Sequence, residues 1–129
     1  MDINVQKHSD INILKLHGAF RLGPAVDSFR ASVEQVLHDG GPKIIVNMTE
    51  VNSVDSSGIG ALVRSQTSVR QKGGAIKIVN PSKLVVQTLQ FVGLLTVFEI
   101  HTDDDAAIHS FSSEGALSTK AKDPAAGWQ

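Results

Sequence analysis

The sequence contains no cysteine among its 129 residues. A disulfide framework and a thiolate zinc site are therefore both excluded. It also lacks any apolar run close to the ~20 residues that a helix needs to cross a bilayer. The first seven residues do not follow the basic-then-apolar order of a signal peptide. We therefore expect a soluble cytoplasmic protein without a membrane partner.

The sequence also lacks an excess of positive or negative charge. Twelve Lys and Arg residues face thirteen Asp and Glu residues, which gives a formal net charge of -1. The basic residues are scattered, so no basic field is present to attract nucleic acid. The five histidines show no metal-ligand spacing to one another; they are His8, His17, His38, His101 and His109. We expect no direct nucleic-acid partner, no metal and no cofactor.

The apolar pattern predicts a single α/β domain. Period-two runs alternate with segments of helical spacing, and glycine pairs or prolines separate them. Such an order demands a mostly parallel sheet with right-handed crossovers. The expected elements are a hairpin turning at 8–10 with its second strand at 11–16, a helix from Pro24 to the Gly40-Gly41-Pro42 stop, a strand at 43–48, a helix from the serine turn to Gly73-Gly74, a strand at 75–79, a helix between Pro81-Ser82 and Gly93, a strand at 97–100, and a helix capped by Thr102 or Asp103 that includes Phe111.

Two further expectations concern the second half of the chain. The helix after Pro81 is expected to turn one stripe inward, formed by Leu84, Val85, Thr88, Leu89 and Val92. Residues 112–129 have little to bury, so we expect the domain to end at residue 111 and a disordered tail to follow. Trp128 stands alone in that tail, and the sequence assigns it no function.

The most informative segment is Asp55-Ser56-Ser57-Gly58, which joins a predicted buried strand to an amphipathic helix. A serine hydroxyl at this place could cap the helix, which is worth ~1 kcal/mol. It could equally be exposed and carry a phosphate, because the unpaired N–H groups and the helix dipole favour an anion there. A phosphate would change the outer surface strongly while the fold tolerates it. The spacing alone leaves both readings open.

Catalytic signatures are missing around these serines. The Gly-x-Ser-x-Gly elbow of serine hydrolases is absent, and no acid-base partner is visible in the sequence. Gly73-Gly74 is a helix-to-strand turn, because the Gly-x-x-x-x-Gly-Lys pattern of a phosphate loop is not present. We expect that the protein is not an enzyme and has no catalytic residue. An unrecognised serine enzyme remains the alternative, to be tested with an acyl- or phosphonyl-type probe.

Asp55-Ser56-Ser57-Gly58-Ile59-Gly60 follows Ile44-Ile45-Val46-Asn47 and precedes Gly73-Gly74-Ala75-Ile76-Lys77-Ile78. With this order of strand and helix, the chain resembles a STAS domain, and more closely the bacterial anti-sigma factor antagonists. The resemblance covers about residues 3 to 111. It implies a single STAS-like domain over 1–111, with a mixed four- to five-stranded sheet and helices packed mainly on one face.

The resemblance also implies a function. In that family the serine directly after the aspartate, which is Ser56 here, is phosphorylated by a partner serine kinase, the anti-sigma factor. The unphosphorylated form binds that kinase and frees the sigma factor, so transcription is regulated; a metal-dependent serine phosphatase resets the switch. Weak self-association stays open. The implied partner-binding residues are Asp55, Ser56, Ser57, Gly58, Ile59, Gly60 and Arg21.

By this analogy each residue of the turn has a role. Asp55 would hold the Ser56 hydroxyl or shape the kinase contact, Gly58 would give clearance, and Ser57 would cap the helix. Two segments depart from the family pattern. The usual Gly-Glu-Leu-Asp is Gly18-Ala19-Phe20-Arg21 here, and a frequent aspartate at the end of the third strand is Asn47. A constitutive scaffold or a transporter-associated STAS subunit without a phospho-switch is the alternative function.

Overall fold

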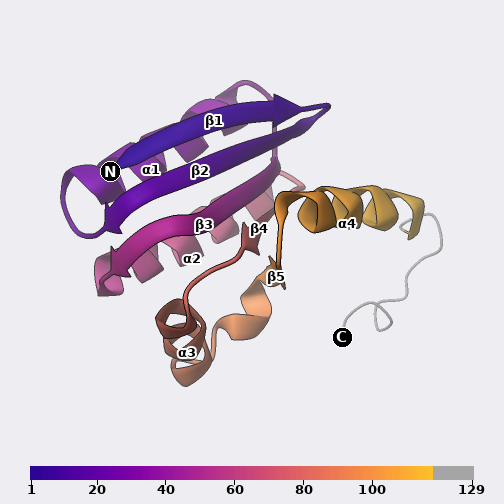
Figure 1. Ribbon diagram of the computed structural model, residues 1–129. Helices are drawn as coiled ribbons and strands as arrows, with labels where there is room; N and C mark the ends of the chain where they lie inside the picture. Colours follow the sequence, from indigo (N-terminus) through magenta and orange to yellow (C-terminus); the bar gives the residue numbers. More distant parts are fainter. Residues whose placement is uncertain (118–129) are drawn as a thin grey trace.

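The computed structural model of the protein describes residues 1–117 and has the α/β order that the sequence predicts (Figure 1). Its elements are β1 (Asp2–His8), β2 (Ile11–Phe20), α1 (Pro24–His38), β3 (Lys43–Val54), α2 (Ser56–Gln71), β4 (Ala75–Val79), α3 (Lys83–Phe91), the 3₁₀ helix η1 (Leu95–Val97), β5 (Glu99–His101) and α4 (Asp104–Leu117). The predicted hairpin is confirmed, with Ser9 at its turn in the left-handed region (φ 59°).

The five strands form one sheet in the order β1-β2-β3-β4-β5. β1 pairs antiparallel with β2, whereas β2, β3, β4 and β5 are mutually parallel. The mixed sheet is therefore confirmed with five strands. Sequential neighbours pair throughout, so each crossover helix returns the chain to the next strand position.

β3 is twice as long as expected from the sequence, and this difference places the site. The predicted strand ended at Met48, but the observed strand continues to Val54. Its second half pairs with the second half of β2, where Gly18 lies opposite Val51 after one register shift and Phe20 lies opposite Val54 after a second. β4 pairs only with the first half, up to Asn47. The ends of β2 and β3 therefore extend together past the rest of the sheet.

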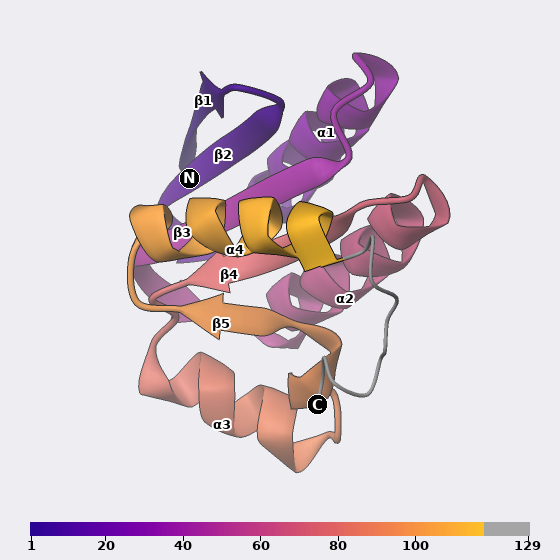
Figure 2. The same ribbon diagram turned by 90° about the vertical axis from the view of Figure 1, so that its right-hand side faces the viewer.

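Helices cover the two faces of the sheet unequally. Figure 2 shows α4 in front of β3, β4 and β5, with α1 and α2 behind the sheet. The large core lies on the α1 and α2 side and also receives Val85 and Leu89 from α3. A small second cluster lies under α4, formed by Ile11, Ile13, Ile45, Val79, Ala107 and Phe111. The expectation of helices mainly on one face is confirmed, and α4 is the helix on the other.

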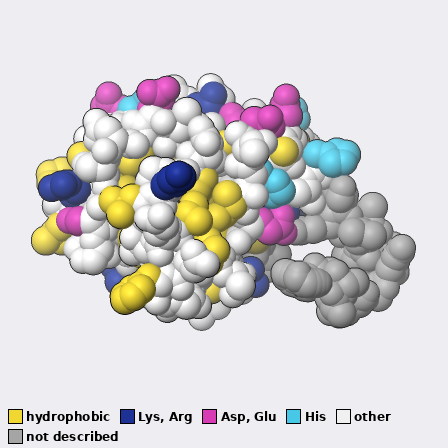
Figure 3. Space-filling view, turned by 60° about the horizontal axis from the view of Figure 1, so that its bottom comes forward, with side chains coloured by type: hydrophobic (Ala, Val, Ile, Leu, Met, Phe, Trp, Pro, Cys, Tyr) yellow, Lys and Arg dark blue, Asp and Glu magenta, His cyan; other side chains and the backbone are white. Residues whose placement is uncertain are grey.

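The predicted inward stripe of α3 is only partly correct. Val85 and Leu89 are buried, but Leu84 is 60% exposed and Val92 is 50% exposed. Phe91 is also almost fully exposed. α3 lies at the β5 end of the sheet and touches the core with a narrow strip, so the neighbouring apolar positions stay in solvent. Figure 3, which brings this side of the molecule forward, shows apolar side chains at the surface.

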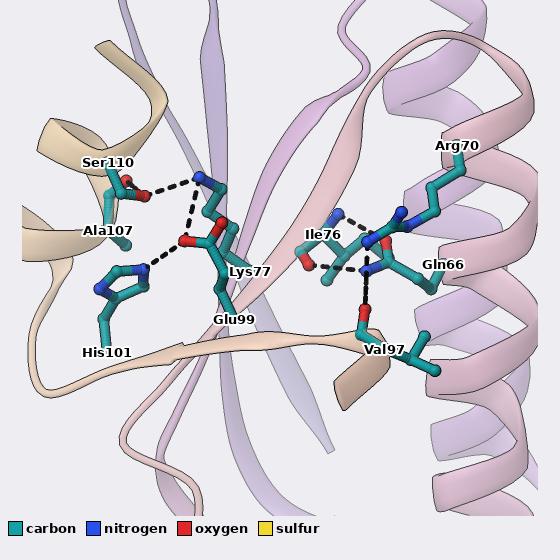
Figure 4. A network of polar contacts seen from close by, with 9 residues as sticks. All are labelled: Gln66, Arg70, Ile76, Lys77, Val97, Glu99, His101, Ala107 and Ser110. Carbon is teal, nitrogen blue, oxygen red and sulfur yellow. Dashed lines mark hydrogen bonds and ion pairs between the residues drawn. The ribbon is translucent and has the colours of Figure 1, made fainter. Parts of the chain in front are cut away.

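Gln66 and Lys77 are almost completely buried between the layers (Figure 4). Gln66 of α2 joins β4 to η1, because its amide donates to the carbonyls of Ile76 and Val97 at 3.1 and 2.8 Å. Its oxygen accepts from Ile76 N–H at 2.7 Å. Lys77 of β4 points to the opposite face, where its ammonium donates to Ser110 Oγ of α4 at 2.7 Å. Both groups are thus hydrogen-bonded, as burial of polar atoms requires.

The last strand and the last helix differ in extent from the expected ones. β5 spans only 99–101, because residues 95–97 form a 3₁₀ turn. Asp103 caps α4 through Oδ1, which accepts from Ala106 N–H at 2.8 Å. The helix continues to Leu117, six residues beyond the expected end of the domain at 111. The rest of the expected tail, 118–129 with Trp128, lies outside the described residues.

Candidate functional site

The Asp55-Ser56-Ser57-Gly58 turn lies where the extended ends of β2 and β3 meet the start of α2. Val54 ends β3 and Ser56 begins α2, so Asp55 alone makes the connection. Its backbone is extended (φ -108°, ψ -178°), as a helix N-cap residue usually is. The loop between β2 and α1 runs alongside, because Phe20 ends β2 opposite Val54. The structure therefore brings Arg21 next to the predicted phosphoacceptor turn.

Asp55 caps α2, and the expectation that Ser57 does so is wrong. Oδ1 of Asp55 accepts from Gly58 N–H at 2.9 Å. Its other oxygen, Oδ2, accepts from Leu22 N–H at 3.0 Å, across 33 positions of sequence. The carboxylate therefore closes the helix end and ties the β2–α1 loop to it. One role expected for Asp55 was to hold the Ser56 hydroxyl. In the structure its carboxylate is hydrogen-bonded to these two backbone N–H groups instead.

These contacts stabilise the charged form of Asp55. The N–H of Leu22, followed by that of Gly58, holds the pKa of the carboxyl below its ordinary value. The N–H of Ser57 and the positive charge of Arg21 act in the same direction. Asp55 is therefore ionised at neutral pH and accepts both hydrogen bonds in full strength.

Gly58 and Ile59 are buried, so neither presents a side chain at the outer surface. A Cβ on Gly58 would collide with the carbonyl oxygen of Phe20. The absence of a side chain at this position therefore makes room for β2. Ile59 is 8% exposed and belongs to the large core. Their place among the predicted partner-binding residues is therefore corrected to a packing role. Gly60 is partly exposed, and a Cβ there would lie 3.1 Å from Nη1 of Arg64.

Ser56 is exposed and Ser57 is half-buried. Neither hydroxyl has a hydrogen bond to any residue in the described part of the chain, 1–117. Asp55 already occupies the N–H that a capping serine would take. The structure thus leaves the Ser56 hydroxyl open to solvent at the first position of α2. An exposed, unengaged hydroxyl beside a helix N-terminus can accept a phosphoryl group without loss of an existing contact.

The β2–α1 loop adds a charged and an apolar side chain to this surface. The guanidinium of Arg21 donates through Nε to Ser53 Oγ at 3.2 Å. Leu22 is 74% exposed directly beside it. Sequence reasoning missed Leu22, although an isolated leucine in a short loop before Pro24 is the signal that could have found it. Exposed apolar groups next to a polar centre are common at protein-binding surfaces.

Asn47, the second departure from the expected pattern, does not belong to this surface. Its amide donates to Asp104 Oδ1 of α4 at 2.9 Å, and its oxygen accepts from Thr49 N–H at 2.9 Å. It therefore helps fix α4 on the opposite face of the sheet. The structure gives no reason to count Asn47 in a contact made through Ser56.

Ser56 lies on an exposed part of the surface. A groove of about 180 Å³ between α1 and α2 has neither Ser56 nor Asp55 among its lining residues, which include Arg30, Glu34 and Arg64. Among residues 1–117, no group of His, Asp or Glu is placed to hold a metal ion. In the same range, no helix is both long and apolar enough to span a membrane.

Comparison with known proteins gives one family and a consistent set of relatives. The family model described as "STAS domain" matches residues 2–107. The anti-sigma-B factor antagonist of Bacillus subtilis (strain 168) is 23% identical over 112 residues, which are 84% of this chain and 99% of that protein.

Solved structures share the fold. The anti-sigma factor antagonist SpoIIAA in its unphosphorylated form matches with a TM-score of 0.69 and 21% identity, covering 86% of this chain and 98% of that one. The Bacillus SpoIIAA in its phosphorylated form matches with a TM-score of 0.71 and 22% identity, over 85% and 99%. The murine anion transporter Slc26a9 matches with a TM-score of 0.70 and 19% identity, over 84% of this chain but 18% of the transporter.

Proposed function

Because the chain belongs to the STAS domain family, we propose that it is an anti-sigma factor antagonist whose binding is switched by phosphorylation of Ser56. In this proposal the unphosphorylated protein binds a serine-kinase anti-sigma factor in the cytoplasm, and the phosphorylated protein is released. A metal-dependent serine phosphatase returns it to the binding form. The protein itself is a substrate of these enzymes and catalyses no reaction.

One observation carries the proposal: Ser56 is exposed and unengaged because Asp55 caps the helix. A kinase can approach this hydroxyl without first breaking a helix end. The relatives named for anti-sigma factor antagonism support the same reading, and one of them is known in unphosphorylated and phosphorylated forms.

The covalent step would be an ordinary phosphoryl transfer. A bond forms between Ser56 Oγ and the γ-phosphorus of ATP, and the bond from that phosphorus to the oxygen bridging it to the β-phosphate breaks. ADP leaves with the electron pair, and the hydroxyl proton passes to a base of the kinase. Hydrolysis by the phosphatase regenerates the serine and releases inorganic phosphate.

The phosphate would end binding by electrostatics and size. It adds roughly -1.5 to -2 charges at pH 7 to a spot that carries a hydroxyl. A closely fitting partner would have to remove that charge from water, and the cost is high even where a cation pairs with the phosphate. Arg21, Leu22, Ser57 and Gly60 surround the site and would form the rest of the contact.

The test is peptide mapping by mass spectrometry of the protein isolated from its own cells, with Ser56→Ala as the control. We expect a phosphate on Ser56 in part of the molecules and none in the variant. Immobilised unphosphorylated protein should then retain a kinase that protein phosphorylated at Ser56 does not retain. A phosphate on Ser57 alone, or none under any growth or stress condition, would overturn the proposal.

The second candidate is a constitutive STAS scaffold or a subunit associated with a transporter. Its support is the match to the transporter Slc26a9, whose chain includes a region of this fold. In that case Ser56→Asp would leave partner affinity unchanged. A drop in affinity for the retained partner by tenfold or more would instead favour the switch.

A further inference from the structure

The contact between Leu22 and Asp55 joins two segments that are distant in the sequence, and each of these residues has a neighbour with a polar side chain. Leu22 N–H donates to Asp55 Oδ2 at 3.0 Å. Arg21 immediately precedes Leu22, and Ser56 immediately follows Asp55. Successive Cα atoms are about 3.8 Å apart, so both side chains start one residue away from the same hydrogen bond. An arginine side chain is long enough to span such a gap.

Within residues 1–117, only the Nε atom of the Arg21 guanidinium is held by a hydrogen bond. Its Nε donates to Ser53 Oγ at 3.2 Å. The Nη groups make no hydrogen bond or ion pair to any residue between 1 and 117. Two parallel N–H groups of a guanidinium match two oxygens of a phosphate, which is the strongest geometry for this pair. The free side of Arg21 is therefore the side that could receive such a group.

The charges around the turn favour Arg21 as the residue that contacts a phosphate on Ser56. Arg21 is close enough to the turn for its charge to act on the Asp55 carboxyl. That carboxylate, next to Ser56, would repel a phosphate, so a nearby cation is needed to stabilise the phosphate there. Arg64 of α2 is the other cation near the first turn, with its guanidinium beside Gly60. Of the two, only Arg21 is joined to the turn by a hydrogen bond of its own loop.

We propose that Arg21 clamps the phosphate of phosphorylated Ser56, so that the released form of the protein is held by an intramolecular arginine–phosphate pair. The inference rests on the proposed function for its biological meaning. In the clamped form the phosphate turns toward the β2–α1 loop and two of its oxygens are occupied. A phosphatase must break this pair before it can reach phosphorus, so dephosphorylation is slowed.

The experiment uses protein with phosphoserine installed at position 56 during synthesis, which makes it independent of any cellular kinase. The second ionisation of the phosphate is followed by ³¹P NMR across pH. A phosphoserine in water has its second pKa near about 6. A guanidinium that contacts the dianion lowers this pKa, and for an exposed pair we expect about one unit, a tenfold change in proton affinity.

Arg21→Ala should raise the phosphate pKa by about one unit relative to wild type, and Arg21→Lys should raise it by part of that amount because lysine lacks the paired donors. Arg30→Ala is the matched control: it removes the same charge from the surface of α1 and should leave the titration unchanged. Added salt should weaken the wild-type shift. With a broadly acting serine phosphatase, Arg21→Ala should be dephosphorylated several-fold faster, and Arg30→Ala should not.

Two results would overturn the clamp: the same phosphate pKa in wild type and Arg21→Ala, or a loss of the shift in Arg64→Ala but not in Arg21→Ala. Arg21 is exposed, so circular dichroism should report an unchanged fold in its variants. The clamp and the proposed function fail separately. A clamp seen by NMR with no phosphate in cells removes the function alone, and a phosphate in cells without the pKa shift removes the clamp alone.

Discussion

Two helices of this protein begin in the same way in sequence and differently in structure. Both α2 and α3 follow a strand of the parallel sheet and have a serine near their first turn. In α3, Ser82 is the cap, and its Oγ accepts from Val85 N–H at 3.2 Å. In α2, Asp55 is the cap, and Ser56 and Ser57 are left without that task.

The difference shows that a serine at a helix start is free only when another residue closes the helix. Ser82 is committed to the fold through its hydroxyl. At α2 the aspartate accepts from Gly58 and also from Leu22, so the adjoining serine has no structural partner to lose. The third position of each helix differs accordingly. Val85 fills the core in α3, whereas α2 has Gly58 against the Phe20 carbonyl.

Gly58→Ala is expected to have the largest effect, because the new methyl group would collide with the Phe20 carbonyl oxygen. Overpacking of this kind costs about 2 kcal/mol even after the better helix propensity of alanine is counted. Urea denaturation measures the loss. Gly60→Ala is the matched control, since its neighbour is the flexible end of Arg64, and it should be neutral or stabilising. Equal stability of the two variants would show that β2 yields at this point.

Asp55→Ala should come next, since it removes both hydrogen bonds and leaves the N–H groups of Leu22 and Gly58 unpaired. We expect a larger fall in Tm than for Ser82→Ala, and faster amide exchange at Leu22. Asp55→Ser makes the start of α2 resemble that of α3. It should restore the helix cap but not the link to the loop, so Leu22 should stay fast in exchange. Protection of Leu22 in that variant would contradict the two-contact account.

The two helix starts should also respond differently to pH. The folded-state pKa of Asp55 is below its ordinary value of 3.8, so its stabilising effect is present above the unfolded pKa. It is lost as the pH falls through the folded pKa. The Tm difference between wild type and Asp55→Asn should therefore hold from neutral pH to about pH 4, then shrink. The difference for Ser82→Ala should not change over this range, because a hydroxyl cap does not titrate.

Ser82→Ala is expected to cost about 1 kcal/mol, the usual value for loss of a side-chain cap. In a domain of this size, thermal denaturation should show it as a fall in Tm of about 4 °C. Ser82→Asp keeps an acceptor at the cap and adds a charge that the helix dipole favours, so it should retain wild-type stability. A neutral Ser82→Ala would mean that the long hydrogen bond at α3 contributes nothing.

Ser56→Ala should have the smallest effect, within about 0.5 kcal/mol of wild type, because no contact is removed. The same holds for Ser57→Ala. Chemical denaturation of both variants beside Ser82→Ala makes the comparison direct. A loss at position 56 equal to that at position 82 would show that the Ser56 hydroxyl closes the helix after all.

The order of elements could be predicted because it depends on local patterns. The glycine pairs, the prolines and the change of apolar period from two to helical spacing located the five strands and the four α-helices, but not η1, and the parallel sheet followed from their alternation. The approach of the β2–α1 loop to the Asp55 turn was also expected from the family resemblance, and the parallel register of β2 and β3 accounts for it. The binding and phosphorylation assigned to these residues stay predictions.

The rest depended on contacts between distant positions. Asp55 and two serines are all good caps, and the choice among them was made by Leu22, which approaches only after β2 and β3 have paired. The apolar stripe of α3 did not reveal how little of it the sheet's edge would cover, so Leu84 and Val92 were placed inside. Lys77 gave no signal, because its burial requires Ser110 of a helix on the opposite face (Figure 4).

The different roles of the residues at the start of α2 also determine which of these positions can change during evolution. Positions 55 and 58 are tied to the fold, through the double acceptor and the close approach of β2. Position 56 carries no such obligation, so descendants of this chain can exchange its hydroxyl for another group with little loss of stability. A substitution at 55 or 58 therefore reports a changed scaffold, whereas under the proposed function a substitution at 56 would report a changed signal.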